Sequence, residues 1–409
     1  MLSLIPVLTT MNQRQGHEAK CDTVIVRFGG EIGIKSEWTR RAYERLVLKN
    51  IYRALRHHGT VYDKLMRKRG RIYVKSDSAS EVAEKLTRVF GISSVSPAAS
   101  IASDMKEIAR AAVAVASDMA ESGSSFAVRC HRVGDHAYSS LDVCRQVGEQ
   151  ILEKLAERKL HVDLTNPQFT ISVEVRESEA YVFANTLQSA GGFPVGSQAK
   201  VVGLLSGGID SPVALWLAMK RGCTVTPVYL DNSPLTDEAT TEKALETARK
   251  LFDWSIGYPR NVYVVPHGKN LQTIIENAPR KFTCLLCKRI MYRIAERIAD
   301  AEKAEGIVTG EAIGEQASQT LVNLRVLNEA VSTYPVHRPL LGFDKTETEA
   351  LARRIGTYET SIREAKGCSA APSQPSTQAR LEAVKEAEKQ LDIATMVEES
   401  IRAARVVSV

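Results

Sequence analysis

The sequence predicts a multidomain protein in which two α+β units precede an α/β domain with a doubly wound parallel sheet. Two observations predict this fold class. Up to residue 188, amphipathic helices are interspersed with strands of alternating polarity, which is typical of small α+β layers. From residue 199, apolar strands and helices alternate regularly, which indicates a parallel sheet covered on both faces. A length of 409 residues leaves room for two or three such domains.

The composition is typical of a globular protein that does not bind membranes. Hydrophobic residues make up 44% and charged residues 25% of the chain, and no window approaches the roughly 18 apolar residues of a membrane-spanning helix. Seven unevenly spaced cysteines argue against a disulfide scaffold and favour a reducing, cytoplasmic location. Residues 1–20 have no basic segment before their apolar run and no cleavage site, so we interpret them as an N-terminal extension and not as a signal peptide.

The first α+β unit is predicted to cover residues 21–97. The segment DTVIVRF alternates polar and β-branched residues as a strand does, and residues 37–55 repeat apolar positions at helical spacing. A second strand, RIYVK, and a second helix, residues 81–90, follow. Pro97 is predicted to end this unit.

The second α+β unit is predicted to cover residues 98–190. It begins with an amphipathic helix over residues 105–119, and a strand, SSFAVRC, and a helix that reaches Arg158 come next. The segment QFTISVEVRESEAYVFANT then alternates in two arms, which is a hairpin signal. The glycine-rich residues 191–198 are predicted to be a linker.

The α/β domain is predicted to cover residues 199–391. Its strands are KVVGLL, TVTPVYL, NVYVVP and GIVTG, with a helical pattern after each of the first three. A charged helix is predicted over residues 378–404, and residues 392–409 are assigned to a C-terminal helical tail.

The strongest chemical signal is the motif SGGIDS, which lies between an apolar strand and a helix predicted to begin at Pro212. Gly207 and Gly208 let backbone N–H groups approach an anion, and the N-terminus of the following helix favours phosphate. Ser206 and Ser211 add hydroxyl donors. No lysine follows the loop as it would in GxxxxGK[ST], so this is not the loop that holds phosphates for γ-phosphoryl transfer.

SGGIDS resembles the pyrophosphate loop (PP-loop) of the N-type ATP pyrophosphatases, which cleave between the α and β phosphates. The resemblance implies ATP and Mg²⁺ as cofactors, with Asp210 needed for nucleotide activation through Mg²⁺ or the phosphates. Asp231 lies at the carboxyl end of the second strand, where α/β sites form, and either binds the ribose or a metal or caps the next segment. The predicted ATP-binding residues are Leu204, Leu205, Ser206, Gly207, Gly208, Asp210, Ser211, Tyr229, Leu230, Asp231, Lys288, Gly310 and Gln319.

Two further segments resemble one family in particular. TGEAIGEQASQTLVNL and RPLLGFDKTETEALARRIGTYE are similar to segments of the tRNA 4-thiouridine synthetases (tRNA sulfurtransferases), in which they help to form the adenylation site. FGGEIGIKS resembles the signature of that family's N-terminal ferredoxin-like domain. FAVRCHRVGDHAYSS resembles its THUMP domain, an RNA-binding module that grips the acceptor end of tRNA. The resemblance covers most of residues 22–391 and suggests as candidates Gly310, Glu311, Gln316, Ser318, Gln319, Arg338, Asp344 and Lys345.

Basic residues of both N-terminal units are predicted to bind tRNA. The loop of the THUMP-like segment carries the donors that a phosphate grip requires, and Tyr138 offers a stacking face. The basic run KLMRKRGR and Arg40-Arg41 would extend the contact along the RNA backbone. The predicted tRNA-binding residues are Lys35, Arg40, Arg67, Lys68, Arg69, Arg129, Arg132, His136 and Arg338.

Three cysteines are predicted to handle sulfur. Cys284 and Cys287 form the motif CLLC at the start of a predicted helix, and Cys368 lies in the segment GCSAAPSQPS. The helix dipole and nearby cations such as Lys288 are expected to lower the pKa of the paired thiols. Together with Asp210, these cysteines are the predicted catalytic residues.

Two mechanisms use three such cysteines. In one, Cys368 carries a persulfide whose terminal sulfur attacks the adenylated carbon, and a CLLC cysteine resolves the resulting disulfide. In the other, the three thiolates hold a [4Fe–4S] cluster whose fourth iron binds and delivers sulfide. The sequence shows no rhodanese domain and so resembles the archaeal branch of the family, which favours the cluster. A zinc site would need a fourth ligand that the spacing does not offer.

The segment around Cys368 lacks the aromatic residue of the family's Cys-x-x-Phe-x-Pro pattern, which leaves the positioning of this cysteine open. The expected activity is ATP-dependent sulfur transfer to uridine 8 of tRNA, through adenylation of the uridine O4, to give 4-thiouridine. The sulfur donor would be sulfide or a persulfide carrier, and the family often forms homodimers. The alternatives are thiolation of another tRNA position and a non-catalytic tRNA-binding factor.

Overall fold

The computed structural model describes residues 20–68 and 70–409 and divides into two compact units. Unit 1 contains the described residues up to Arg27, residues 60–85 and residues 94–188, and unit 2 contains residues 28–59, 86–93 and 189–409. Apart from Lys20, the predicted N-terminal extension lies outside the described residues. None of the helices found in the described ranges is long and apolar enough to cross a membrane.

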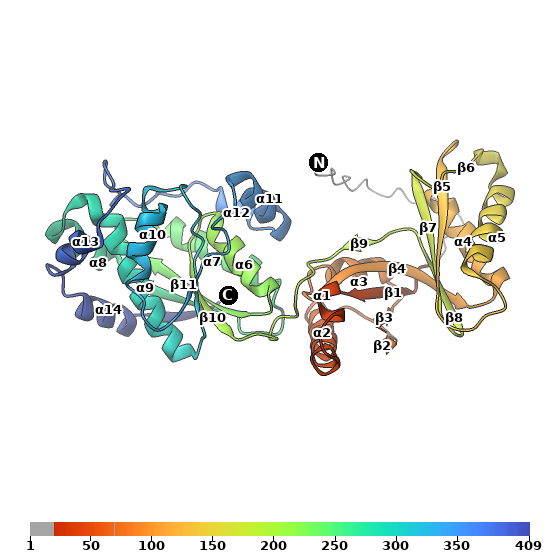
Figure 1. The fold of residues 1–409 in the computed structure, drawn as a ribbon, viewed down its shortest axis with the longest axis horizontal. Coiled ribbons are helices and arrows are strands. Elements are labelled where there is room, and N and C mark those ends of the chain that lie inside the picture. The colour runs from red at the N-terminus through yellow and green to blue at the C-terminus, as the bar shows by residue number, and fades with distance from the viewer. Residues whose placement is uncertain (1–19, 69) are drawn as a thin grey trace. The chain divides into compact units, whose positions relative to one another are not determined.

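Unit 1 is built on a nine-stranded sheet (Figure 1). The strand order is β2-β3-β1-β4-β8-β7-β5-β6, and β9 pairs with β4. The bounds are β1 Thr23–Phe28, β2 Lys64–Lys68, β3 Arg71–Lys75, β4 Ile92–Ala102, β5 Ser125–Arg132, β6 His161–Val162, β7 Phe169–Val175, β8 Glu179–Phe183 and β9 Leu187–Gln188. Because β4 neighbours both β1 and β8, the predicted end of the first layer at Pro97 lies inside a strand that the two layers share.

Two long helices cover the β5, β7 and β8 part of this sheet (Figure 1). Asp104 caps α4 (Met105–Met119), and Ser139 caps α5 (Ser140–Lys154) in a capping box. The apolar faces of both helices and the inward residues of the strands form one buried core. Unit 1 also contains α3 Ala79–Leu86 and the 3-10 helix Ala156–Arg158.

Unit 2 contains the doubly wound sheet that the strand and helix alternation predicts. The order is β14-β13-β10-β11-β12-β15, in which all pairs are parallel except β12 with β15. The bounds are β10 Lys200–Leu205, β11 Thr224–Asp231, β12 Asn261–Pro266, β13 Ile307–Val308, β14 Val336–His337 and β15 Arg405–Ser408. The chain adds β11 and β12 on one side of β10 and then adds β13 and β14 on the other side. This reversal in strand order creates a switch point between β10 and β13, where such sheets bind ligands.

Helices cover both faces of this sheet (Figure 1). Val202 and Leu204 of β10 contribute to a core with α9, α10 and α14, whereas Val201 and Leu205 contribute to a core with α6, α7 and α11. Because β10 is buried on both faces, its sequence is a continuous apolar run. The bounds are α1 Gly30–Gly33, α2 Glu37–His57, α6 Asp210–Lys220, α7 Glu238–Phe252, α8 Gly268–Asn277, α9 Thr283–Glu302, α10 Leu321–Asn328, α11 Lys345–Ile355, α12 Tyr358–Ser361, α13 Leu381–Glu388 and α14 Ile393–Arg402, with 3-10 helices Arg280–Phe282 and Ala317–Gln319.

The segment predicted to be a linker is packed within unit 2. Val195 is buried, and the backbone N–H of Gly196 donates to the carbonyl oxygen of Gly222 at 2.9 Å. The buried Asn50 of α2 donates to the carbonyl oxygen of Val195 at 3.1 Å. Residues 191–198 are therefore not a free tether, and α2 belongs to the same compact unit.

The C-terminal segment differs from the single charged helix predicted for residues 378–404. Two helices form there, and Asp392 caps the second by accepting from the backbone N–H of Thr395. The predicted helical tail ends in a strand, because β-branched Val406 and Val407 suit the edge pairing of β15 with β12.

Candidate active site

The SGGIDS loop joins the carboxyl end of β10 to the N-terminus of α6, at the switch point of the sheet. The backbone N–H of Ser206 donates to Ser211 Oγ at 2.8 Å, and the two hydroxyl oxygens are 3.0 Å apart. Ser206 Oγ also accepts from the backbone N–H of Gly208 at 3.2 Å. The serines thus close the loop, while Ser206 and Gly208 stay exposed beside the positive end of α6. The helix begins at Asp210, two residues before the predicted Pro212.

Two glycines let neighbouring segments pack closely around this loop. A Cβ at Gly310 would lie 2.7 Å from both N and Cα of Ser211, closer than real Cβ contacts. The chain after β13 can therefore meet the backbone of α6 only because this position has no side chain. A Cβ at Gly203 would lie 2.2 Å from Cδ2 of Leu215, the end of a side chain, so β10 packs closely against Leu215 of α6.

Asp210 is paired with a lysine from the second predicted site segment. Lys345 Nζ donates to Asp210 Oδ1 at 2.7 Å and lies 3.4 Å from a Glu315 oxygen. Lys345 is the first residue of α11, where Asp344 forms a capping box. Burial alone would lower the pKa of Lys345, but the two carboxylates raise it above its usual value, so the amine is charged. A charged lysine beside the PP-loop is placed to bind phosphate oxygens.

Glu311 is the acceptor of a buried network. It accepts from Lys288 Nζ at 3.2 Å, from Thr309 Oγ1 at 3.1 Å and from Arg338 Nε at 2.9 Å. The hydroxyl of Tyr292 donates to the same carboxylate. Burial would raise the pKa of Glu311, but Lys288, Tyr292 and Arg338 hold it below its usual value. The charged carboxylate therefore connects α9, the chain after β13 and the chain after β14.

Asp231 ends β11, and its side chain forms hydrogen bonds within the turn that follows. Its Oδ1 accepts from the backbone N–H of Ser233 at 3.0 Å and from the Ser233 hydroxyl at 2.7 Å. Its carbonyl oxygen accepts from the backbone N–H of His267 at 2.7 Å. Of the two predicted roles, the local cap is therefore present in the structure.

The three predicted cysteines lie within electrostatic range of one another. Cys284 and Cys287 occupy the first two turns of α9, and Cys368 lies exposed in a loop. Burial raises the pKa of both Cys284 and Cys287, and the charge of Cys368 adds to the rise.

Backbone contacts on both sides of Cys368 hold this loop. The backbone N–H of Ser369 donates to the carbonyl oxygen of Leu235 at 3.2 Å, and Arg280 Nη2 donates to that of Ala370 at 3.3 Å. Further along, buried Asn323 donates to the carbonyl oxygen of Ser376 at 2.8 Å. These anchors explain how Cys368 is positioned without the family's aromatic residue.

The expected lowering of the thiol pKa by the helix dipole does not occur. Burial raises the pKa of Cys287 to about 12, and the charges of Cys368 and Cys284 add to the rise. Burial also raises the pKa of Cys284, and Lys288 offsets only part of this effect. Desolvation of a buried thiolate outweighs the dipole of one helix end.

The donor set fits an iron–sulfur cluster in its chemistry, since three thiols from α9 and one loop are the ligands that such clusters take. Over residues 20–68 and 70–409, however, no three His, Cys, Asp or Glu side chains are gathered closely enough to hold a metal ion.

Three family models match successive parts of the chain. A ThiI ferredoxin-like domain matches residues 23–96, a THUMP domain matches residues 102–185, and the thiamine biosynthesis protein (ThiI) model matches residues 196–393. A probable tRNA sulfurtransferase of Methanosarcina acetivorans is 41% identical over 96% of this chain and 95% of its own. One from Methanothermobacter thermautotrophicus is 38% identical over 93% and 96%. The chain belongs to the ThiI family.

Solved structures agree with this assignment. The crystal structure of a 4-thiouridine synthetase–RNA complex with bound ATP matches with a TM-score of 0.84 and 34% identity, covering 94% of this chain and 99% of that one. The crystal structure of PH1313 from Pyrococcus horikoshii matches with a TM-score of 0.65 and 27% identity, covering 82% and 99%. The fold class predicted for this ThiI-family chain is confirmed.

Among the ATP contacts predicted for this ThiI-family member, the structure separates loop residues from core residues. Leu204, Leu205, Tyr229 and Leu230 are buried in the two hydrophobic cores, so only their backbone could meet a nucleotide. Gln319 is also buried, and its Oε1 accepts a backbone N–H at 3.4 Å. The residues at or next to the loop are Ser206, Gly207, Gly208, Asp210, Ser211 and Gly310.

The predicted RNA-binding residues of the THUMP domain shape their own loop. Arg132 Nη1 donates to the carbonyl oxygen of Gly134 at 3.0 Å and lies 3.3 Å from His136 Nδ1. Arg129 Nη2 donates to the carbonyl oxygen of Leu164 at 2.6 Å, and the Tyr138 hydroxyl donates to the carbonyl oxygen of Ser103 at 2.6 Å. Arg129 remains exposed and can add an RNA contact.

The other predicted RNA contacts belong to other elements of the chain. Lys68 Nζ is 2.8 Å from Glu179, so RNA binding there must compete with an ion pair. Lys35 lies over an aromatic ring, with its Nζ 5.1 Å from the ring centroid, and Arg40 is part of α2. Arg69 lies outside the described residues.

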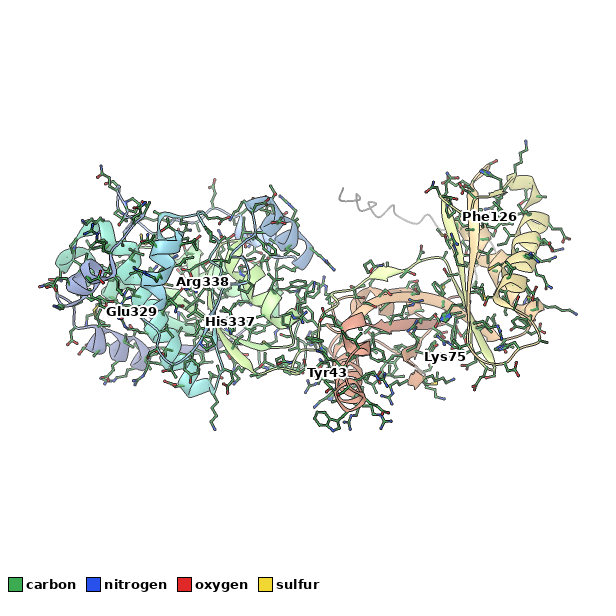
Figure 2. The ribbon with its side chains drawn as sticks, viewed as in Figure 1. Tyr43, Lys75, Phe126, Glu329, His337 and Arg338 are labelled. Carbon is green, nitrogen blue, oxygen red and sulfur yellow. The ribbon has the colours of Figure 1, made fainter. Side chains whose placement is uncertain are left out.

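Arg338, a predicted tRNA contact, binds the Glu311 network with its side chain. It follows His337 at the end of β14 (Figure 2). Its side chain is 13% exposed. Its Nε donates to Glu311, and its Nη2 donates to the Tyr292 hydroxyl at 3.3 Å. We therefore assign it to the buried network.

The sequence pattern did not single out three polar residues near the sulfur-handling segments. His267 is fully buried with its Nε2 3.3 Å from Cys287 Sγ. Among the described residues, Asn232 Oδ1 and Thr236 Oγ1 are buried without a hydrogen-bond partner, and both belong to the segment that anchors the Cys368 loop. Isolated polar residues of this kind carry no motif, which is why sequence reasoning missed them.

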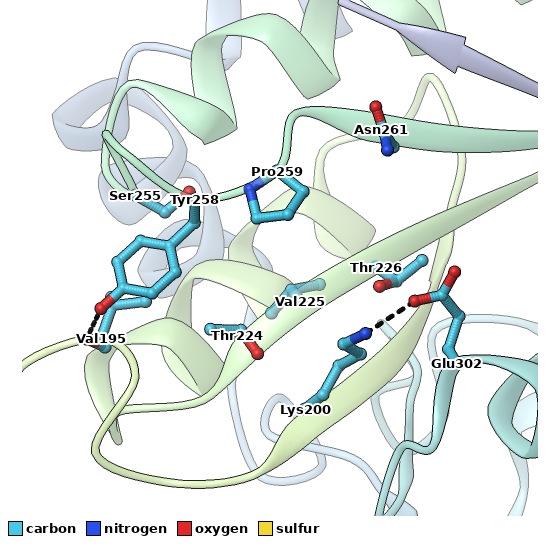
Figure 3. Close-up of a pocket in the computed structure, with 10 residues that line it drawn as sticks. All are labelled: Val195, Lys200, Thr224, Val225, Thr226, Ser255, Tyr258, Pro259, Asn261 and Glu302. Atoms are coloured by element: carbon cyan, nitrogen blue, oxygen red, sulfur yellow. Dashed lines mark hydrogen bonds and ion pairs between the residues drawn. The ribbon is translucent and has the colours of Figure 1, made fainter. Parts of the chain in front are cut away.

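A cavity of about 80 Å³ lies at the other end of the same sheet (Figure 3). Its lining includes Lys200, Thr224 and Asn261, the first residues of β10, β11 and β12. Lys200 pairs with Glu302 there at 2.7 Å. Because these are amino ends of parallel strands, the cavity is separate from the PP-loop site.

Proposed function

We propose that this protein is an ATP-dependent tRNA sulfurtransferase that converts uridine 8 of tRNA to 4-thiouridine in the cytoplasm. The observation that carries the proposal is that unit 2 combines a PP-loop at the sheet's switch point with two cysteines at the start of α9 and a third in a loop that is anchored beside that helix. Support comes from full-length relatives named probable tRNA sulfurtransferases and from a 4-thiouridine synthetase solved with RNA and ATP.

The first step is activation of the uridine. The O4 oxygen attacks the α-phosphorus of ATP, and pyrophosphate leaves. AMP is then a good leaving group, whereas an amide-like oxygen is a poor one. The PP-loop and the N-terminus of α6 would bind the phosphates, and Lys345 would stabilise the charge that develops on them. Asp210 would hold Mg²⁺, which neutralises phosphate charge when bound.

The second step brings sulfur to C4 and releases AMP. Cys284, Cys287 and Cys368 would hold an iron–sulfur cluster, which supplies an open iron site for sulfide when bound. In the alternative chemistry, the exposed Cys368 carries a persulfide whose terminal sulfur attacks C4 and displaces AMP. A thiol of α9 then attacks Cys368 Sγ and releases the sulfur on C4, which leaves a disulfide between Cys368 and α9 that an external thiol reductant reduces. In both, the partly buried thiols of α9 act together with the exposed Cys368.

Binding of tRNA would involve the acceptor end and the THUMP domain. Exposed cations would contact the RNA backbone, with the salt dependence that such contacts bring. The remaining partners of the proposal are a sulfide or persulfide donor and a second copy of the chain. The proposed RNA contacts are Lys35, Arg40, Arg67, Lys68, Arg69, Arg129, Arg132 and His136.

Anaerobic purification with iron and acid-labile sulfide analysis tests the sulfur chemistry. Wild type is compared with Cys284→Ala, Cys287→Ala and Cys368→Ala, each assayed for 4-thiouridine in tRNA. Loss of iron and activity in all three variants supports the cluster. Active wild-type protein without iron, with activity abolished only by Cys368→Ala, supports the persulfide and overturns the cluster.

Product analysis separates the remaining functions. Mass spectrometry of digested tRNA distinguishes 4-thiouridine from a 2-thiouridine product of another position. A non-catalytic tRNA-binding factor would release no AMP and no pyrophosphate with ATP and tRNA, so their formation excludes it.

A further inference from the structure

A buried histidine contacts one of the three cysteines. His267 follows β12, and its side chain is fully buried. Its Nε2 lies 3.3 Å from Cys287 Sγ. Its backbone N–H donates to the carbonyl oxygen of Asp231 at 2.7 Å, so the backbone of His267 is held against the end of β11.

Asn270 determines which ring nitrogen of His267 carries the proton. The amide nitrogen of Asn270 lies 3.2 Å from His267 Nδ1 and 2.7 Å from Ser400 Oγ. An amide nitrogen has two hydrogens and only donates, so it can serve both contacts at once. Nδ1 is then the acceptor, and the neutral ring carries its proton on Nε2. Asn270 and Ser400 are themselves buried, which keeps water from replacing either contact.

The contacts of Cys287 leave its sulfur able to accept a hydrogen bond from His267. Cys287 Sγ lies 3.9 Å from Met291 Sδ one turn later on α9, and its thiol hydrogen points there. The lone pairs of the same sulfur are then free to accept from His267.

We propose that His267 is a positioning residue for sulfur transfer, whose Nε2–H donates a hydrogen bond to the Cys287 sulfur and stabilises that sulfur when it carries negative charge. The inference rests on the proposed function, in which Cys287 is a cluster ligand or a resolving thiol. Such a bond fixes the direction of the sulfur and tunes any centre that it ligates. His267, Asn270 and Ser400 thereby link α14 and the end of β12 to the cysteine pair.

Nitrogen NMR of the full chain tests the tautomer directly. The protein has eight histidines, and the ring signals of His267 in ¹⁵N-histidine-labelled protein are identified by their loss in His267→Gln. We expect a protonated Nε2 and an unprotonated Nδ1. A protonated Nδ1, or a doubly protonated ring at neutral pH, overturns the inference.

Variants test what the bond does. His267→Phe keeps a ring but has no donor, and 4-thiouridine formation should fall by roughly 10- to 100-fold. His267→Gln can still donate an N–H and should stay within about threefold of wild type. The visible spectrum of anaerobically loaded protein should change in His267→Phe and not in His267→Gln. Asn270→Ala is the second variant if His267→Phe does not fold, with the same loss expected.

The outcomes separate this inference from the proposed function. If folded His267→Phe has the wild-type rate and spectrum while Cys287→Ala is inactive, His267 has no positioning role and the function stands. If Cys287→Ala is fully active, the proposed role of Cys287 fails, and the inference fails with it. Unchanged ATP binding in all variants confirms that the PP-loop site is intact.

Discussion

At the residue scale, position 310 admits only glycine because two backbone segments meet there. Gly310→Ala places a Cβ 2.7 Å from the backbone of Ser211, so either the PP-loop or the chain after β13 must move. We expect AMP formation with ATP and tRNA to fall at least tenfold, since small displacements in a catalytic site cost about a hundredfold. Gly342→Ala is the matched control, because a Cβ there has no atom within 4 Å. Equal activity of the two variants would contradict the close approach.

Glu311 makes the stability of unit 2 depend on pH. Glu311→Gln leaves Lys288 and Arg338 without their buried charge partner, which should cost roughly 3–5 kcal/mol at neutral pH. The folded pKa of Glu311 is lowered, so its stabilisation is fully present above the unfolded pKa of about 4.3 and is lost as the pH falls through the folded value.

Urea unfolding followed by tryptophan fluorescence checks this prediction. The three tryptophans, at positions 38, 216 and 254, all belong to unit 2. The difference in midpoint between wild type and Glu311→Gln should be large at neutral pH and shrink in acid. The exposed Glu276→Gln should show no such difference. If the difference in midpoint between wild type and Glu311→Gln instead grew as the pH falls, the lowered pKa of Glu311 would be refuted.

At the element scale, α9 joins the two chemical parts of unit 2. Its first turns carry Cys284 and Cys287, and the next turns carry Lys288 and Tyr292, which bind Glu311. A charge cluster on the same helix holds it to its neighbours: buried Arg289 donates to Glu329 at 2.7 Å and to Glu388 at 2.8 and 2.9 Å. The position of the cysteines therefore depends on contacts to α10 and α13.

Replacement of Arg289 should loosen α9. Arg289→Met leaves the Glu388 carboxylate, which is only 12% exposed, without one of its two arginine partners, and we expect a loss of roughly 3–5 kcal/mol by urea unfolding. Arg297→Met, on the exposed face of the same helix, should change stability by less than about 0.5 kcal/mol. If both variants unfold at the same urea concentration, the cluster does not hold the helix.

Periodicity predicted the long elements and not the short ones. KVVGLL and TVTPVYL are buried on both faces, so their apolar runs indicated β10 and β11 directly. β13 has only two residues and was predicted within the longer segment GIVTG, whereas β14, which also has two residues, was not predicted. The register that brings Arg338 to Glu311 depends on β14, and its buried role was missed for that reason.

At the scale of the whole molecule, the motif residues were predictable and their surroundings were not. SGGIDS and CLLC identified the PP-loop and two thiols because each chemistry requires a local spacing. The thiol pKa depends instead on burial by segments distant in sequence, so the predicted direction was wrong. The packing of α2 and residues 191–198 in unit 2 likewise depends on long-range contacts that composition does not indicate.

We expect the distribution of charge, and not the net charge alone, to determine tRNA binding by this chain. The net charge is +6, whereas α2 alone carries six Lys or Arg residues and two Glu residues, a net charge of +4 from these residues. Arg41, Arg45 and Lys49 are exposed at a spacing of four residues, which places them along one face of the helix. Such a row suits the phosphates of an RNA backbone.

Neutralising that row should lower both the affinity for tRNA and its salt dependence. In the triple variant Arg41→Gln, Arg45→Gln and Lys49→Gln, the slope of log affinity against log salt should become shallower by up to about 0.9 for each phosphate that the helix no longer neutralises. A control triple variant replaces the exposed cations Lys389, Arg402 and Arg405. Filter binding over a salt series measures both slopes. Long-range attraction would respond equally to the loss of three charges from either place, so equal slopes in the two variants would mean that the net charge alone attracts tRNA. If only the α2 variant has a shallower slope than wild type, α2 binds phosphates directly.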